Sequence, residues 1–238
     1  MLPVEDRPGR IDPMKRLLVG LVVLALLALG LDRGGVYVAE RVAGSSLQDS
    51  QGLSERPDVD IAGFPFLDQL ASGRYDRIEV AVRELPLGTG TGLSLARLDL
   101  VLSEVETTRD FSRIDVGRAR ADAVISFADL GDLLGLDLSS AGDGQLRVSR
   151  TFTVLGTDVE PSITVAPTIV DGALSLSEFS VNGAADAAGV VTEALDDLLG
   201  VAVPLQGIPF DVELDDVGVE RDGLHLSLSG SDLRYVSP

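Results

Sequence analysis

The apolar and polar positions of the chain are most sharply divided near its start, where an unbroken apolar run covers residues 17–31 and follows four basic residues. As an α-helix this run would be about 22 Å long, compared with about 30 Å for the hydrocarbon core of a bilayer. That length fits a short membrane anchor or the apolar segment of a signal peptide, and we favour the anchor. Because basic flanks stay in the cytoplasm, we expect residues 1–33 to form a cytoplasmic tail and membrane segment. Residues 34–238 are then an extracytoplasmic domain held at the cell membrane.

Beyond the run, apolar residues recur at helical spacing over residues 36–47, which predicts a short amphipathic helix or a plain connector. The next distinctive feature is Pro65, which has no backbone N–H to donate to a sheet. We therefore expect a strand edge or a bend at this point, from which Phe64 and Phe66 project.

Alternation of apolar and polar residues over 77–84 is typical of a half-buried strand. In the following strand the apolar positions change parity after Leu95, so we expect a bulge near Ala96 or Arg97 that bends the strand. Further alternation predicts a strand over 116–127 and hairpins formed by the segments 145–154, 158–165 and 174–181, and by 210–220 with 224–228. Many antiparallel strands with a few short helices define an α+β fold.

Two helices are predicted among these strands. Ser126, followed three residues later by Asp129, resembles a capping box, and the helix that it begins should end at Gly135. The second helix, over 187–199, has an apolar stripe opposite an acidic face. The leucines and valine on the apolar sides of these helices are Leu130, Leu133, Leu134, Val191, Leu195 and Leu198.

The charge of the chain excludes one class of partner. It has 19 basic and 38 acidic residues, a net charge of −19. The first 33 residues hold five basic and four acidic groups, so the remainder has 14 basic and 34 acidic groups and a charge of −20. Because so acidic a domain repels nucleic acid, we expect no nucleic-acid partner. The absence of cysteine also excludes disulfides and a lipid-modified cysteine.

Known catalytic and metal-binding patterns are missing from the sequence. It has no G-x-S-x-G motif and no P-loop, and the glycines at 88, 90 and 92 have the wrong spacing for dinucleotide binding. His225, the only histidine, alternates with leucines in a predicted strand, which is typical of a structural residue. We therefore expect no enzymatic activity, no cofactor and no metal.

Several short motifs occur in an order that resembles a family of actinobacterial cell-envelope proteins, formerly catalogued as a domain of unknown function. They are the apolar run, Gly-Phe-Pro-Phe-Leu at 63–67, Gly-Arg-Tyr-Asp at 73–76, Ser-Phe-Ala-Asp-Leu at 126–130 and Ile-Pro-Phe at 208–210. The mycobacterial member of this family supports mannan elongation of lipomannan and binds phospholipid. The resemblance implies a tubular lipid-binding-like fold, in which a curved, mostly antiparallel sheet wraps around one or two amphipathic helices and an apolar cavity.

We therefore predict an envelope protein that binds a phospholipid or a lipid-linked glycan precursor in an apolar cavity, with transfer of that lipid left open. The alternative is a non-catalytic scaffold that recruits envelope-biosynthesis enzymes, which a filled core and a large exposed apolar patch would favour. The residues expected to contact lipid are Phe64, Phe66, Leu67, Ile78, Val80, Leu130, Leu133, Leu134, Val191, Leu195, Leu198 and Phe210. The candidates for binding a phosphate headgroup are Arg74, Arg77, Arg118 and Arg120.

Overall fold

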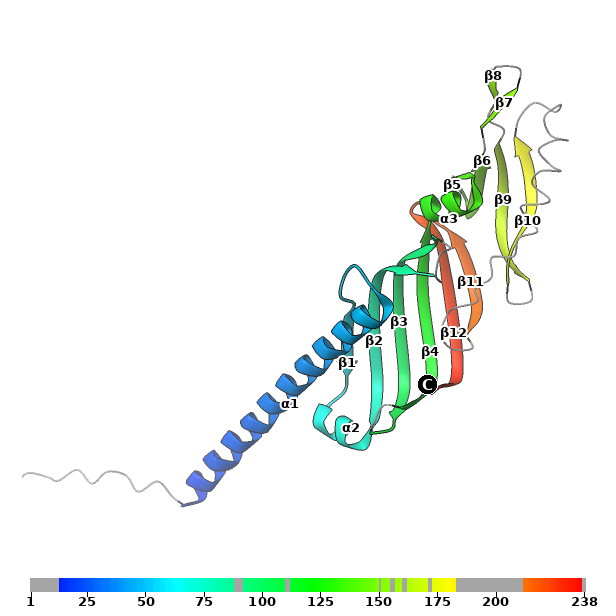
Figure 1. Cartoon of the computed structure of the whole chain (residues 1–238). Coiled ribbons are helices and arrows are strands. Elements are labelled where there is room, and N and C mark those ends of the chain that lie inside the picture. The colour runs from blue at the N-terminus through cyan, green and yellow to red at the C-terminus, as the bar shows by residue number, and fades with distance from the viewer. Residues whose placement is uncertain are drawn as a thin grey trace, which may run out of the picture.

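The computed structural model describes residues 13–87, 92–109, 112–149, 151–154, 157–159, 162–170, 173–182 and 212–236 (Figure 1). Its elements in chain order are α1 (Pro13–Gln51), β1 (Asp58–Ala62), α2 (Phe66–Ser72), β2 (Arg74–Pro86), β3 (Ser94–Thr107), β4 (Arg113–Ser126), α3 (Phe127–Leu134), β5 (Asp137–Gly142), β6 (Gln145–Ser149), β7 (Phe152–Val154), β8 (Thr157–Val159), β9 (Ser162–Val170), β10 (Ala173–Asn182), β11 (Glu213–Val219) and β12 (Gly223–Val236). The predicted helix over 187–199 lies outside the described residues.

A curved, six-stranded sheet, which we call the main sheet, forms the larger part of the described fold (Figure 1). Its strand order is β1-β2-β3-β4-β12-β11, and every neighbouring pair is antiparallel. The strands β2, β3, β4 and β12 are 13 or 14 residues long and pair with one another in a continuous register. Together with the long N-terminal helix, this sheet confirms the predicted α+β fold with a curved antiparallel sheet.

A second, four-stranded sheet continues the molecule beyond α3, with the order β10-β9-β6-β5 (Figure 1). The pairs β6–β9 and β9–β10 confirm the hairpins predicted for the segments 145–154, 158–165 and 174–181. The short hairpin β7–β8 lies between β6 and β9 in the chain. Apolar residues of β6 and β9 belong to the same buried cluster as those of β11 and β12, so the two sheets share a core.

Helix α1 is one continuous helix of 39 residues, about 58 Å long at the usual rise per residue. The predicted short helix over 36–47 is therefore the second half of α1. This half runs along the edge strand β1, where Glu40 Oε1 accepts a hydrogen bond from Ile61 N at 3.0 Å and Gly44 allows the close approach of Pro57. Covering this edge protects backbone groups that another strand would otherwise pair with. By contrast, the side chains of residues 21–31 are exposed.

Helix α3 begins and ends where the sequence predicts. Ser126 Oγ accepts a hydrogen bond from Asp129 N at 3.0 Å, and Gly135 terminates the helix with a φ of 66°, in the left-handed region that favours glycine. Leu130 is buried, but Leu133 is 43% exposed. The helix contacts β4 and β5 at the end of the main sheet and does not lie within its curve (Figure 1).

Two local predictions are wrong. The pairing of β2 with β3 keeps one register past Ala96 and Arg97, so there is no bulge at that point; instead Glu84, opposite Ala96, has a φ of 52°. Phe66 does not project, because the bend at Pro65 leads directly into α2 and turns the first side chain of that helix inward. Phe66 is 2% exposed, whereas Phe64 is 60% exposed.

Candidate functional site

One side of the main sheet is apolar from edge to edge. The strand pairing aligns its residues in three rows that cross the sheet, and we call these rows together the apolar face. The rows are Ile61, Ile78, Leu102 and Ala119; Val59, Val80, Leu100, Ala121, Leu228 and Leu214; and Val82, Leu98, Ala123, Leu226 and Val217. The alternation of side chains along each strand accounts for this separation, because every second residue points to the same side.

The centre of the apolar face carries little side-chain volume. Strand β4 contributes only alanines to the three rows. Ala121 and Ala123 lie between leucines of β3 and β12, and Ala119 lies between Leu102 and Gly230. Ala121 faces Leu100 on one side and Leu228 on the other. The neighbouring side chains Leu98 and Leu100 are half-buried rather than buried. The alanines are themselves buried in the shared core, so an extended acyl chain reaches this row of methyl groups only where that packing opens. Each methylene buried there contributes about 0.8 kcal/mol.

The four arginines predicted to bind a headgroup lie on the opposite, polar side of the main sheet. Arg118 and Arg120 alternate with the alanines of β4 and therefore point away from the apolar face. Three of the four form exposed ion pairs: Arg118 with Glu104 at 2.7 Å, Arg77 with Glu79 at 2.7 Å and Arg74 with Glu106 at 3.1 Å. Such exposed pairs add little to stability. The structure does not bring these arginines together with the apolar face, and their contact with a headgroup stays a prediction.

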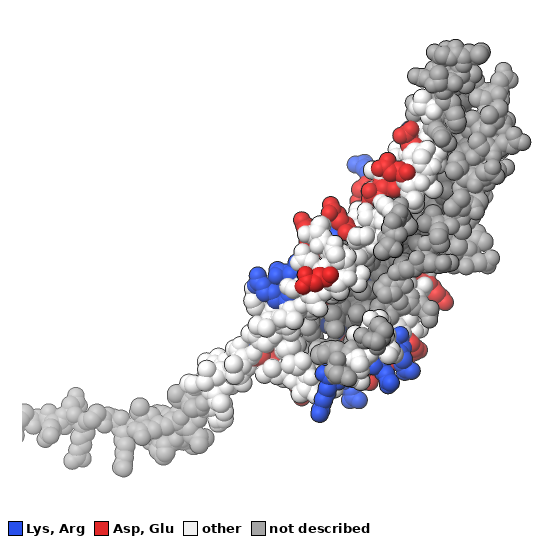
Figure 2. Space-filling view, viewed as in Figure 1, with Lys and Arg blue, Asp and Glu red and all other residues white. Residues whose placement is uncertain are grey.

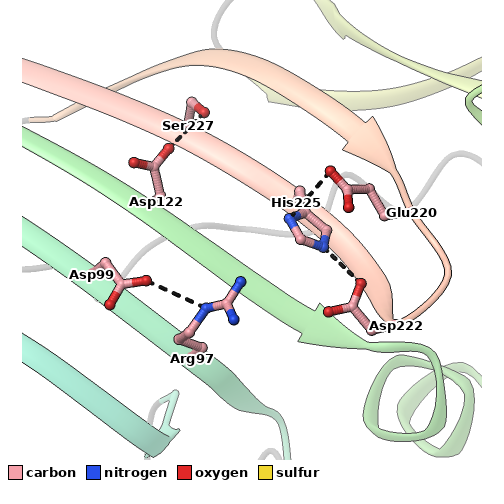
Figure 3. A network of polar contacts seen from close by, with 7 residues as sticks. All are labelled: Arg97, Asp99, Asp122, Glu220, Asp222, His225 and Ser227. Carbon is pink, nitrogen blue, oxygen red and sulfur yellow. Dashed lines mark hydrogen bonds and ion pairs between the residues drawn. The ribbon is translucent and has the colours of Figure 1, made fainter.

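The histidine singled out in the sequence takes part in a polar network on this side (Figure 3). Asp222 Oδ1 accepts a hydrogen bond from His225 Nε2 at 2.8 Å, and Glu220 Oε1 is 3.8 Å from His225 Nδ1. This hydrogen bond is the main cause of the lowered pKa of Asp222. One ligand atom from each of these three residues lies within 4.8 Å of the others, a spacing that a metal ion could bridge. The carboxylates are exposed and the imidazole is already hydrogen-bonded. These contacts are therefore explained by the stabilisation of the turn between β11 and β12.

The apolar residues predicted to contact lipid occupy three different environments. Ile78 and Val80 belong to the apolar face. Those that pack in the core are Phe66, Leu130 and Leu134. Those that are exposed are Phe64, Leu67 and Leu133. The remaining candidates, Val191, Leu195, Leu198 and Phe210, lie outside the described residues.

A second feature lies where α2 meets the first half of α1, at the end of the main sheet that we call the α2 end. Here Asp32, the residue after the apolar run, is 3% exposed, and its Oδ1 accepts a hydrogen bond from Leu67 N at 2.9 Å. The other carboxylate oxygen, Oδ2, is buried and has no hydrogen-bond partner among the described residues. Nothing in the local sequence pattern revealed this contact, because 35 residues separate its two members.

The α2 end also contains a surface groove with a volume of about 350 Å³. Its lining residues are Leu70, Ala71, Gly73, Thr107, Thr108 and Arg109. Sequence reasoning did not select Leu70 or Arg109 as site residues. Helical spacing does not separate Leu70 from the buried Phe66, because residues four apart lie on the same side of a helix, so the sequence carried no signal for the exposed leucines.

The geometry therefore combines an apolar sheet face with one helix, among the described residues, that is long and apolar enough to cross a membrane. This combination defines a class of protein suited to holding lipid. Comparison with protein families matches residues 30–229 to the LmeA-like phospholipid-binding family, and the chain belongs to this family. Comparisons with curated proteins and with solved structures gave no match.

Proposed function

We propose that α1 holds this protein in the cell membrane and that its extracytoplasmic domain binds one phospholipid or lipid-linked glycan precursor against the apolar face. The row of alanines along β4 is the observation that carries this proposal. Membership of a phospholipid-binding family supports a lipid ligand. A role in the elongation of an envelope glycan, as in the mycobacterial relative, is part of the proposal and is supported by the resemblance alone.

The position of the basic residues supports the proposed orientation. Four basic residues precede the apolar run, and the domain that follows carries −20. Basic flanks favour the cytoplasmic side of a membrane. A reporter enzyme that is active only outside the cytoplasm, fused after Pro238, tests this orientation. Activity of a cytoplasmic reporter at the same position would overturn it.

A larger side chain in place of an alanine of β4 tests the lipid site. We expect Ala121→Leu to reduce the amount of phospholipid that the full-length protein retains in detergent, because the added methyl groups occupy the path of the acyl chain. Val101→Leu is the matched control: Val101 lies beside Leu100 and Leu102 but points to the polar side of β3. Mass spectrometry of extracted lipid, with circular dichroism as a check of folding, measures the difference.

Two outcomes would contradict this placement of the site. In the first, Ala121→Leu retains as much lipid as the control. In the second, it lowers the free energy of unfolding by about 1–3 kcal/mol without changing retained lipid, as expected for overpacking of a filled core. The second result would favour the non-catalytic scaffold as the function of the domain.

A further inference from the structure

Helix α2 buries Phe66 at its start, but its other residues depart from the pattern of an ordinary surface helix. Its polar residue Gln69 is 8% exposed, and the Gln69 side chain donates to Ala62 O at 3.3 Å and accepts from Asp76 N at 3.2 Å. Its apolar residues Leu67 and Leu70 are instead 46% and 47% exposed. A surface helix of a soluble protein normally turns its leucines inward. The outward leucines therefore indicate a surface that contacts something apolar.

The contacts between α2 and α1 place this surface next to the apolar run. Leu67 N donates to Asp32, and the Phe66 ring packs against α1 at Gly35, where an added Cβ would be 3.4 Å from the ring. Leu31, one residue before Asp32, is 70% exposed. If residues 17–31 lie in a bilayer, Asp32 follows after one helical rise of about 1.5 Å, so α2 lies at the surface of that bilayer.

Basic side chains gather at the same end of this acidic protein (Figure 2). The strands β2, β3, β4 and β12 begin or end there and bring Arg74, Arg109, Arg113 and Arg234 to one end of the main sheet. Arg74 and Arg234 are paired with carboxylates, whereas Arg109 and Arg113 form no ion pair with any described residue. Arg33 lies over the ring of Phe64, 5.2 Å from its centroid. Positive charge beside exposed apolar side chains is typical of a contact with anionic lipid.

We propose that the α2 end docks on the membrane that α1 enters: Phe64, Leu67 and Leu70 insert into the interfacial layer of an anionic bilayer, and Arg109 binds a lipid phosphate. This inference rests on the proposed function, because it requires α1 to lie in the membrane. It adds a fixed orientation of the domain, in which the groove beside Arg109 opens towards the lipid surface. The exposed phenylalanine and leucines then bury their apolar area in lipid.

The chain has no tryptophan, so one introduced tryptophan reports on one position. The test uses the full-length Leu70→Trp variant in vesicles of phosphatidylcholine and phosphatidylglycerol whose acyl chains are brominated. We expect its emission to shift to shorter wavelength and to be quenched at least twofold. Asp132→Trp on α3 is the control, since Asp132 is exposed and α3 lies at the other end of the main sheet. Its emission should be unquenched.

Leu67→Trp serves as a second reporter if Leu70→Trp fails to fold. Docking is overturned if the α2 reporters are as weakly quenched as Asp132→Trp, or if all positions are quenched equally. Adding Arg109→Gln to Leu70→Trp should weaken quenching in phosphatidylglycerol vesicles but leave it unchanged in pure phosphatidylcholine. Equal quenching with and without Arg109 would overturn its assigned role. Retained lipid, measured on the same samples, reports separately on the proposed function, so the failure of either inference is recognised by itself.

Discussion

Gly117 of β4 lies directly against the side chain of Glu104 on β3: a Cβ at position 117 would be 2.9 Å from Glu104 Cβ and 2.7 Å from Glu104 Oε2. Glu104 has a φ of 56°, and Asp232, which faces Gly117 from β12, has a φ of 54°. Beside Gly117, the alternation of inward and outward residues along β3 is interrupted: Leu102 and Val105 both face the core, although they are three residues apart. Because β4 and β12 interrupt their alternation at the same position, the sheet bends there and the pairing of the strands keeps its register.

Replacing Gly117 should therefore disturb the bend. We expect Gly117→Ala to lower the free energy of unfolding by about 1–3 kcal/mol, because the Cβ of Glu104 is not a flexible end that can move aside. The matched control is Gly218→Ala on β11, where an added Cβ would meet nothing within 4 Å. Urea unfolding of the full-length protein, followed by circular dichroism, measures both. Equal stability of the two variants would contradict the proposed strain.

The two phenylalanines around Pro65 should have opposite effects. We expect Phe66→Ala to cost about 3–5 kcal/mol, since this ring is 2% exposed and packs in the core with Tyr75. Phe64→Ala should change the free energy of unfolding by less than about 1 kcal/mol, mainly through its contact with Arg33. The same unfolding experiment compares them. A stable Phe66→Ala variant would show that the ring lines a space and does not support the core.

The carboxylate of Asp32 should matter for the attachment of α2 to α1. We expect Asp32→Ala to cost about 1–3 kcal/mol, because Leu67 N loses a charged acceptor. Asp32→Asn should cost less, since its amide oxygen still accepts this hydrogen bond. It also removes a buried carboxylate whose Oδ2 has no hydrogen-bond partner in the part of the chain that the structure describes. Thermal unfolding in detergent ranks the two variants. An Asp32→Asn protein less stable than Asp32→Ala would reverse this interpretation.

Stability should depend on pH through Asp222. Its pKa in the folded protein is lowered from 3.8 by the hydrogen bond from His225, so the ionised carboxylate stabilises the fold above that pH. This contribution is lost as the pH falls through the lowered pKa. We expect Asp222→Asn to be slightly less stable at neutral pH and to show a shallower loss of stability in acid. Unfolding midpoints from pH 7 to pH 3 test this, with the exposed Asp215→Asn of the same hairpin as the control. Parallel pH profiles for the two variants would rule out the role of the His225 contact.

The sequence alone determined the elements whose causes are local. The apolar run, the capping of α3 by Ser126 and the last hairpin around Gly223 follow from spacing, hydrogen-bonding capacity and turn chemistry within a few residues. The alternation along β4 likewise predicted a strand. These features need no knowledge of distant parts of the chain.

Only the tertiary structure decided which apolar residues face the core and which face outward. Phe66 and Leu70 are equally apolar, but the contact of α2 with Asp32, far away in sequence, turns the first inward and leaves the second exposed. The bend at Gly117 depends on a residue in each neighbouring strand, and the parity change in β3 could not be located from that strand by itself. Ala121 and Ala123 of β4 became a candidate site only when pairing placed leucines of β3 and β12 on either side of them. In each case the cause is a contact between two segments that are distant in the sequence, and the pattern of one segment does not identify the other.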